Sequence, residues 1–162
     1  MGRSLGHFDV VYSWGVLHHT GAMWQAMENV LTPLSPGGTL CIAIYNDQGR
    51  KSEIWRRVKR VYCSGLLGRI AMSAVFIPYF VLAGLRNDLR EQSWPLDRYT
   101  RYKCSRGMSV VNDWHDWLGG YPFEVASRDA VATFYGQRGL ALVLVIPNDG
   151  SGCNQFVLAR GG

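Results

Sequence analysis

Two short segments of the chain concentrate side chains that can bind a ligand or transfer a proton. The first is the pair His18 and His19, and histidine suits proton transfer because its charge changes near neutral pH. The second is Asp113 to Trp117, which places Asp116 directly after His115. Neighbours in sequence need not touch, so each segment also has a structural interpretation as hydrogen-bonded packing residues.

The elements that must position the histidine pair follow the order strand, helix, strand. Phe8 to Ser13 is short, apolar and β-branched, as in a buried strand. Apolar residues at helical spacing run from Met23 to Leu34, and Pro36-Gly37-Gly38 then ends the helix. Thr39 to Tyr45 is a continuous apolar run, which is typical of a parallel strand covered on both faces. This order predicts a parallel unit of an open α/β sheet.

The same kind of pattern resumes near the C-terminus. Ser127 can cap a helix that Gly139 ends. Leu140 to Ile146 and Asn154 to Ala159 are strand-like, and the loop between them is short and rich in turn residues. We therefore expect an antiparallel hairpin here, and an α/β fold in which one antiparallel strand closes the sheet.

The middle of the chain has a different composition. Between Arg50 and Arg106 there are 13 basic and 4 acidic residues, whereas the rest has 4 basic and 8 acidic residues. Ile70 to Leu85 carries no charge and is interrupted by Pro78. We predict a basic and apolar helical insert at about 48–110 within one domain spanning 1–162.

Three functions fit this insert, and we favour a helical lid over a bound substrate. Its basic cluster beside an apolar segment also has the composition of an interfacial anchor, so peripheral membrane contact through 50–90 stays open. A full span needs ~20 clean apolar residues, and Arg69 and Pro78 argue against one. The apolar bulk behind the charges argues against a nucleic-acid partner.

The order and spacing of these motifs resemble the second half of a class I S-adenosylmethionine-dependent methyltransferase. Phe8 to His19 matches that family's fourth strand, F-D-x-V followed by V-L-H-H, and Leu34 to Leu40 matches its P-G-G turn. Asp116 to Glu124 and Gly152 to Val157 look like a bacterial subgroup of the ubiquinone-biosynthesis type. The resemblance implies the C-terminal half of a Rossmann-like sheet, strands four to seven, with the last strand antiparallel.

The resemblance further implies S-adenosylmethionine as the cofactor and methyl transfer to a small, lipophilic acceptor. Ligands in open α/β sheets bind outside the carboxyl ends of the strands, which places Ser13, Trp14 and Gly15 at the cofactor with His18 beside them. Trp14 matches a family position that contacts the cofactor, and Gly15 lets the backbone approach it. The alternative for Trp14 is packing against the neighbouring helix.

Three residues are candidates for the acceptor side. His19 is a candidate general base, and His115 and Asp116 are candidates to line the acceptor pocket. Ubiquinone-type relatives tend to carry acidic residues where Gly15 and His18 stand, and those acids support a divalent metal. We therefore predict no metal site, and the four cysteines have no C-x-x-C spacing for zinc.

The family's glycine-rich cofactor turn and acidic ribose contact are not found before Phe8. The resemblance thus implies a fragment whose activity alone is impaired. The alternative is a non-catalytic remnant, or a subunit that completes its sheet with another chain, because an open strand-four edge recruits partners or self-associates. The lack of a dinucleotide fingerprint argues against a nicotinamide-binding fold. No long apolar stretch follows Met1, so we expect no signal peptide and a cytoplasmic location.

Overall fold

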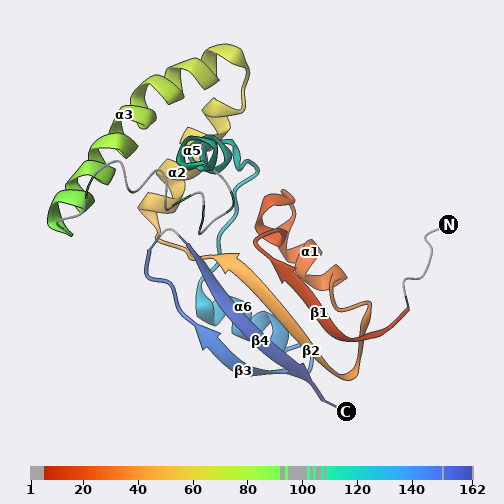
Figure 1. Ribbon diagram of the computed structural model, residues 1–162. Coiled ribbons are helices and arrows are strands. Elements are labelled where there is room, and N and C mark those ends of the chain that lie inside the picture. Colours follow the sequence, from red (N-terminus) through yellow and green to blue (C-terminus); the bar gives the residue numbers. More distant parts are fainter. Residues whose placement is uncertain are drawn as a thin grey trace. The chain divides into compact units, whose positions relative to one another are not determined.

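The computed structural model describes residues 6–91, 94, 102, 104, 107, 109–150 and 152–161. The chain divides into two compact units, whose elements are labelled in Figure 1. Unit 1 comprises Met1–Ile54 and Pro122–Gly162 and contains the sheet. Unit 2 comprises Trp55–Tyr121 and is helical.

The sheet of unit 1 has the strand order β1-β2-β4-β3. Its strands are β1 (Phe8–Trp14), β2 (Leu34–Tyr45), β3 (Leu140–Ile146) and β4 (Cys153–Arg160). β1 and β2 are parallel, and β4 is antiparallel to both of its neighbours. The predicted α/β fold and the antiparallel pairing of the last two strands are confirmed.

Two helices and the inner face of the sheet form the core of unit 1. The helices are α1 (Met23–Asn29) and α6 (Arg128–Gly136), and a 3₁₀ turn, η1 (Leu17–His19), precedes α1. The fully or nearly fully buried core side chains include Met23, Met27, Leu40, Ile42, Ile44, Val131, Tyr135, Phe156 and Leu158. The Tyr135 hydroxyl donates to the Met27 carbonyl at 3.1 Å and so joins the two helices. Ser127 caps α6, as predicted, by accepting a hydrogen bond from the Ala130 N–H.

The helix predicted to extend to Leu34 ends earlier. α1 stops at Asn29, and Leu34 is the first residue of β2. Pro33 explains the difference, because a proline disfavours the helical conformation of the residue before it. Leu34 is still fully buried, so its apolar character was interpreted correctly as a core signal but assigned to the wrong element.

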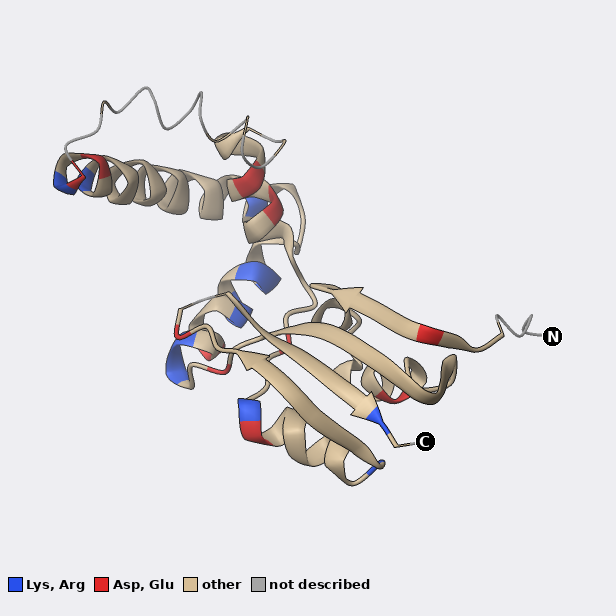
Figure 2. Ribbon diagram, turned by 60° about the horizontal axis from the view of Figure 1, so that its bottom comes forward, with Lys and Arg blue, Asp and Glu red and all other residues tan. Residues whose placement is uncertain are grey.

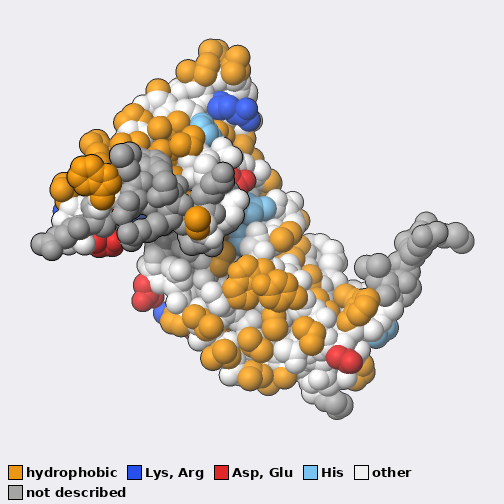
Figure 3. Space-filling view, viewed as in Figure 1, with side chains coloured by type: hydrophobic (Ala, Val, Ile, Leu, Met, Phe, Trp, Pro, Cys, Tyr) orange, Lys and Arg blue, Asp and Glu red, His pale blue; other side chains and the backbone are white. Residues whose placement is uncertain are grey.

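The other face of the sheet carries exposed apolar side chains. Val10, Tyr12 and Trp14 alternate along β1 and are 61%, 65% and 43% exposed. In register, Tyr12 lies opposite Cys41, which lies opposite Val157. Figure 3 shows hydrophobic side chains gathered over this part of unit 1. Isolated exposed apolar residues are common on protein surfaces, but a contiguous row of them is typical of a surface that a partner or ligand covers.

Unit 2 is built around a cluster of aromatic rings. Its helices are α2 (Arg50–Tyr62), which begins in unit 1, α3 (Leu66–Arg90) and α5 (Val110–Gly119). Trp55 packs against Phe76 and Trp117 at ring-centroid distances of 5.2 and 4.3 Å, and Phe80 packs against Trp114 and Trp117 at 5.8 Å. The compact unit and the predicted insert overlap over residues 55–110, and the function of the insert as a lid stays a prediction.

A buried lysine lies beside this cluster. Lys59 is fully buried, and its ammonium group donates a hydrogen bond to the Trp117 carbonyl and lies 4.1 Å from the Trp117 ring centroid. Desolvation by burial lowers the pKa of Lys59 to about 8, and the charges of Cys63 and Asp116 oppose that shift. The lysine thus links α2 to α5 while retaining a costly buried charge.

Candidate functional site

The carboxyl ends of β1 and β2 lie at one edge of the sheet because the two strands are parallel. The predicted cofactor residues lie there: Ser13 pairs with Ile42, and Trp14 pairs with Ala43. The Trp14 ring stacks on Tyr12 with centroids 5.3 Å apart and an interplanar angle of 2°. Trp14 is 43% exposed, so a flat aromatic surface remains accessible beside the strand end.

Gly15 continues this edge with an unusual backbone conformation. Its φ is +73°, in the left-handed region that glycine adopts without strain. Its N–H donates to the Ala43 carbonyl at 3.4 Å. A Cβ at this position would meet no heavy atom within 4 Å. The turn therefore needs glycine for its conformation, and the space beside it is open to a ligand.

His19 has the geometry of an oriented base. Its Nδ1 lies 2.7 Å from the Pro122 carbonyl oxygen. A carbonyl only accepts, so Nδ1 carries the proton of the neutral ring and Nε2 keeps its lone pair. The side chain is half-buried. A histidine held through Nδ1 in this way can accept a proton at Nε2.

His18 is placed differently, although it is the adjacent residue. It is 1% exposed, and its Nδ1 accepts a hydrogen bond from the Tyr45 N–H at 3.4 Å. Its carbonyl accepts from the Glu124 N–H at 3.0 Å, and its ring lies 4.1 Å from the Tyr45 ring. These contacts connect the segment after β1 to the end of β2. A direct contact of His18 with a cofactor stays a prediction.

A third segment, Pro122 to Ala126, completes the edge. The Glu124 carboxylate accepts from the Met23 N–H at 3.0 Å, which satisfies a backbone donor at the start of α1. The Ala126 N–H donates to the Tyr45 carbonyl at 3.1 Å. The segment is thus hydrogen-bonded to the end of β2, to η1 and to the start of α1, and it supplies the carbonyl that orients His19.

Tyr45 is a site residue that the sequence analysis missed. Its ring lies within 5.6 Å, between centroids, of the rings of His18, His19 and Phe123. A signal was present, because Tyr45 ends the apolar run that predicts the second parallel strand. The rule that places Ser13 to Gly15 at a binding edge applies equally to the residue that ends β2.

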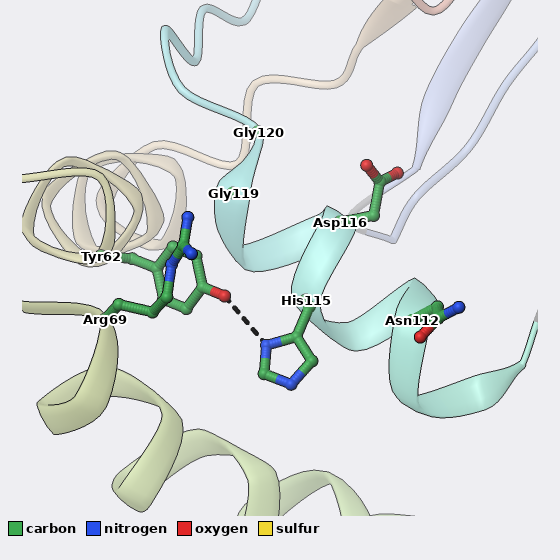
Figure 4. Close-up of a pocket in the computed structure, with 7 residues that line it drawn as sticks. All are labelled: Tyr62, Arg69, Asn112, His115, Asp116, Gly119 and Gly120. Atoms are coloured by element: carbon green, nitrogen blue, oxygen red, sulfur yellow. Dashed lines mark hydrogen bonds between the residues drawn. The ribbon is translucent and has the colours of Figure 1, made fainter. Parts of the chain in front are cut away.

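Unit 2 has a hollow of about 740 Å³, which Figure 4 shows with its lining side chains. The lining residues are Tyr62, Arg69, Asn112, His115, Asp116, Gly119 and Gly120. The hydrogen-bond partner of His115 is the Tyr62 hydroxyl, 2.9 Å from Nδ1, and not Asp116. In Figure 4 the Asp116 carboxylate points away from the His115 ring. The two residues therefore share a pocket without forming a pair.

The predicted site residues form two groups. Ser13, Trp14, Gly15, His18 and His19 belong to the sheet edge of unit 1, and His115 and Asp116 belong to the pocket of unit 2. Tyr62 and Arg69 also line that pocket, and no local pattern marks either of them. Within the described ranges, no group of three or more His, Cys, Asp or Glu side chains could hold a metal ion.

Comparison with known proteins identifies solved structures with a similar fold. No family model and no curated protein matches this chain. PKMT2 from Rickettsia typhi matches with a TM-score of 0.53 and 13% identity over 99% of this chain. PKMT2 from Rickettsia typhi in complex with AdoHcy matches with a TM-score of 0.55 and 11% identity over 97% of this chain. An O-methyltransferase family protein from Burkholderia thailandensis matches with a TM-score of 0.47 and 14% identity over 98% of this chain.

The chain spans 36%, 37% and 32% of the lengths of these three structures, about a third in each case. The two PKMT2 structures carry the argument for the fold, because their TM-scores exceed 0.5. At these identities the likeness shows the fold alone. Four strands with their helices have the arrangement of part of the PKMT2 structure.

Proposed function

We propose that this chain is part of an S-adenosylmethionine-dependent methyltransferase and carries one edge of the cofactor site. The observation that carries the proposal is the open turn at the carboxyl end of β1, where Trp14 is exposed and Gly15 has a positive φ. The same fold in PKMT2 from Rickettsia typhi is known in complex with AdoHcy, the demethylated form of this cofactor. The strand order fits strands four to seven of the family, and the subgroup we propose is the ubiquinone-biosynthesis type.

The cofactor, when bound, supplies an electrophilic methyl group. Trp14 offers an apolar surface to it, and the backbone at Gly15 leaves room for close approach. We propose that the remaining contacts come from residues outside this sequence, since the chain spans about a third of the matched structures. The affinity of this chain alone is then low.

The acceptor is proposed to be a small, lipophilic molecule that loses a proton on methylation. His115 is the candidate base for an acceptor in the pocket of unit 2, where Tyr62 orients its ring. His19 is the candidate base at the sheet edge, where its Nε2 can take the proton. Either imidazole would take up the proton that the acceptor atom loses when the methyl group passes to it from the sulfonium sulfur, which would leave as AdoHcy.

Calorimetric titration of the chain with AdoHcy tests the cofactor proposal. We expect a dissociation constant weaker than about 10 μM and at least tenfold weaker binding by Trp14→Ala, because the variant loses the exposed ring. Trp24→Ala is the matched control: Trp24 is 42% exposed, lies on α1 and packs on Phe134. Equal affinities of the two variants would contradict the proposal.

A second candidate function is favoured by the exposed sheet face. We propose as the alternative that the chain is a subunit or remnant whose sheet is completed by another chain or a second copy. Val10, Tyr12 and Trp14 form an apolar row on β1, whose pairing within the described residues is with β2 alone. Such an edge favours association.

Sedimentation velocity over a range of concentrations distinguishes this alternative. We expect self-association that Tyr12→Glu weakens. Val143→Glu is the control, because Val143 is 64% exposed on β3, close to the 65% of Tyr12. A monomer at all concentrations would argue against completion by a second copy.

A further inference from the structure

The outer face of α3 is apolar along nearly its whole length. Leu67, Ala71, Ala74, Pro78, Leu82, Leu85 and Leu89 recur at spacings of three and four, which places them on one helix face. All seven are exposed, and Leu67, Leu82 and Leu89 are 83%, 66% and 76% exposed. This stripe extends over about 33 Å at 1.5 Å per residue. We call it the α3 stripe.

The opposite face of α3 is already occupied. Phe76 and Phe80 pack into the ring cluster of unit 2, and Gly84 and Asp88 are buried. The stripe is therefore not the packing face of α3 within the described part of unit 2. A soluble surface rarely exposes a contiguous apolar strip of this length without a partner.

By length and composition α3 could cross a membrane, and it is the one such helix among the described residues. Its packing favours an orientation in the plane of the membrane instead. A crossing would carry the partners of Phe76 and Phe80 into hydrocarbon, including α2 with Lys59 and α5 with Asp116. Charged groups there are costly. Lying flat leaves these contacts intact and immerses only the stripe.

Basic side chains lie where lipid headgroups would be in that orientation. Arg69 lies on the opposite face of α3 and lines the pocket of unit 2, whereas Arg86 and Arg90 are exposed near the end of α3 on the flank of the stripe. The last two line a hollow of about 440 Å³ with Tyr79, Leu82, Ala83 and Asn87. Figure 2 shows basic groups at this end of α3 together with acidic ones, of which Glu91 is exposed and Asp88 is buried.

We propose that the α3 stripe docks in the plane of a bilayer that contains anionic phospholipid. Leu67, Leu82 and Leu89 enter the boundary of the acyl chains, and Arg86 and Arg90 contact lipid phosphates. Over residues 55–121 the sequence has eleven basic and five acidic residues, so its net charge favours a negative surface. The proposal does not depend on the methyltransferase function.

Vesicle co-sedimentation of the whole chain tests the proposal. We expect binding to vesicles of 70% phosphatidylcholine and 30% phosphatidylglycerol, and at least tenfold weaker binding to phosphatidylcholine alone. Arg86→Gln with Arg90→Gln should weaken binding to anionic vesicles by roughly thirtyfold, at about 1 kcal/mol per basic residue near the surface. Leu67→Glu with Leu82→Glu should abolish binding to both compositions.

The matched control is Leu144→Glu, which adds a charge at a 51% exposed leucine of β3 and should leave vesicle binding unchanged. Circular dichroism checks that each variant retains its helix content. Absence of binding to anionic vesicles would overturn the proposal. So would the finding that the stripe is a dimer interface, that is, that the parent chain does not bind vesicles but forms a dimer, and that Leu67→Glu with Leu82→Glu dissociates this dimer. Resistance of bound chain to extraction at pH 11 would overturn the in-plane orientation, because a crossing helix stays in the membrane.

Discussion

Replacing Lys59 by methionine should change how the stability of unit 2 depends on pH. Burial lowers the pKa of Lys59 from 10.5 to about 8 in the folded chain. Below pH 8 the lysine is protonated in both states, so the folded chain bears the full cost of the buried charge. Between pH 8 and 10.5 the unfolded chain binds more protons, so stability rises with pH across this window. Lys59→Met removes this titration.

The magnitude follows from the shift. The pKa of Lys59 differs by about 2.5 between the unfolded and the folded chain, which corresponds to about 3 kcal/mol of stability. Most of this change falls between pH 7.5 and 10. Over that range the stability of the parent chain should rise by about 2 to 3 kcal/mol relative to Lys59→Met. At pH 7.5 itself, the variant should be more stable than the parent chain by less than this amount. The reason is that it also loses the charged hydrogen bond to the Trp117 carbonyl, which is worth about 1.5–3 kcal/mol.

Urea unfolding followed by tryptophan fluorescence measures this difference, because Trp55, Trp114 and Trp117 report on unit 2. Lys51→Met is the control: Lys51 is exposed on α2, and its removal should leave the pH profile parallel to that of the parent. Parallel profiles for the parent chain and Lys59→Met between pH 7.5 and 10 would refute the burial argument.

Three further outcomes follow from particular contacts. Tyr135→Phe should destabilise unit 1 by about 1 kcal/mol, because it removes the buried hydrogen bond to the Met27 carbonyl; thermal unfolding measures this. Burial raises the pKa of Cys153 to about 11, so at pH 8 iodoacetamide should alkylate Cys153 far more slowly than the exposed Cys63, as mass spectrometry of labelled peptides would show. Gly15→Ala should cost about 1 kcal/mol in urea unfolding through its positive φ without a steric clash, and no loss would contradict the assigned turn.

The local parts of the fold were predictable from the sequence. The apolar runs at Phe8–Trp14 and Leu140–Ile146 form strands because they are short, apolar and bounded by polar or turn residues. The short loop between β3 and β4 predicts their antiparallel pairing. The position of β4 between β2 and β3 is a property of the whole sheet, and no local pattern in the sequence predicts it.

The chemistry of the site was less predictable, because distant segments determine it. His18 and His19 are adjacent and of one residue type, yet their neutral rings have opposite tautomers. His18 accepts at Nδ1 from the Tyr45 backbone, whereas His19 donates from Nδ1 to the Pro122 carbonyl, 103 residues away. Likewise the hydrogen-bond partner of His115 is Tyr62, 53 residues distant, and the carboxylate of the adjacent Asp116 points away from the His115 ring (Figure 4).

The central claim is that the turn at the end of β1 is an edge of a cofactor site. Amide NMR spectra of the chain, recorded during titration with AdoHcy into the millimolar range, test it even when binding is weak. We predict that AdoHcy changes the chemical shifts of the Ser13 and Gly15 amides and of the Trp14 indole N–H, but not that of the Trp24 indole N–H. In Gly15→Val these changes should disappear. Unchanged resonances at Ser13 to Gly15 throughout the titration, or shifts confined to β3, would contradict the account.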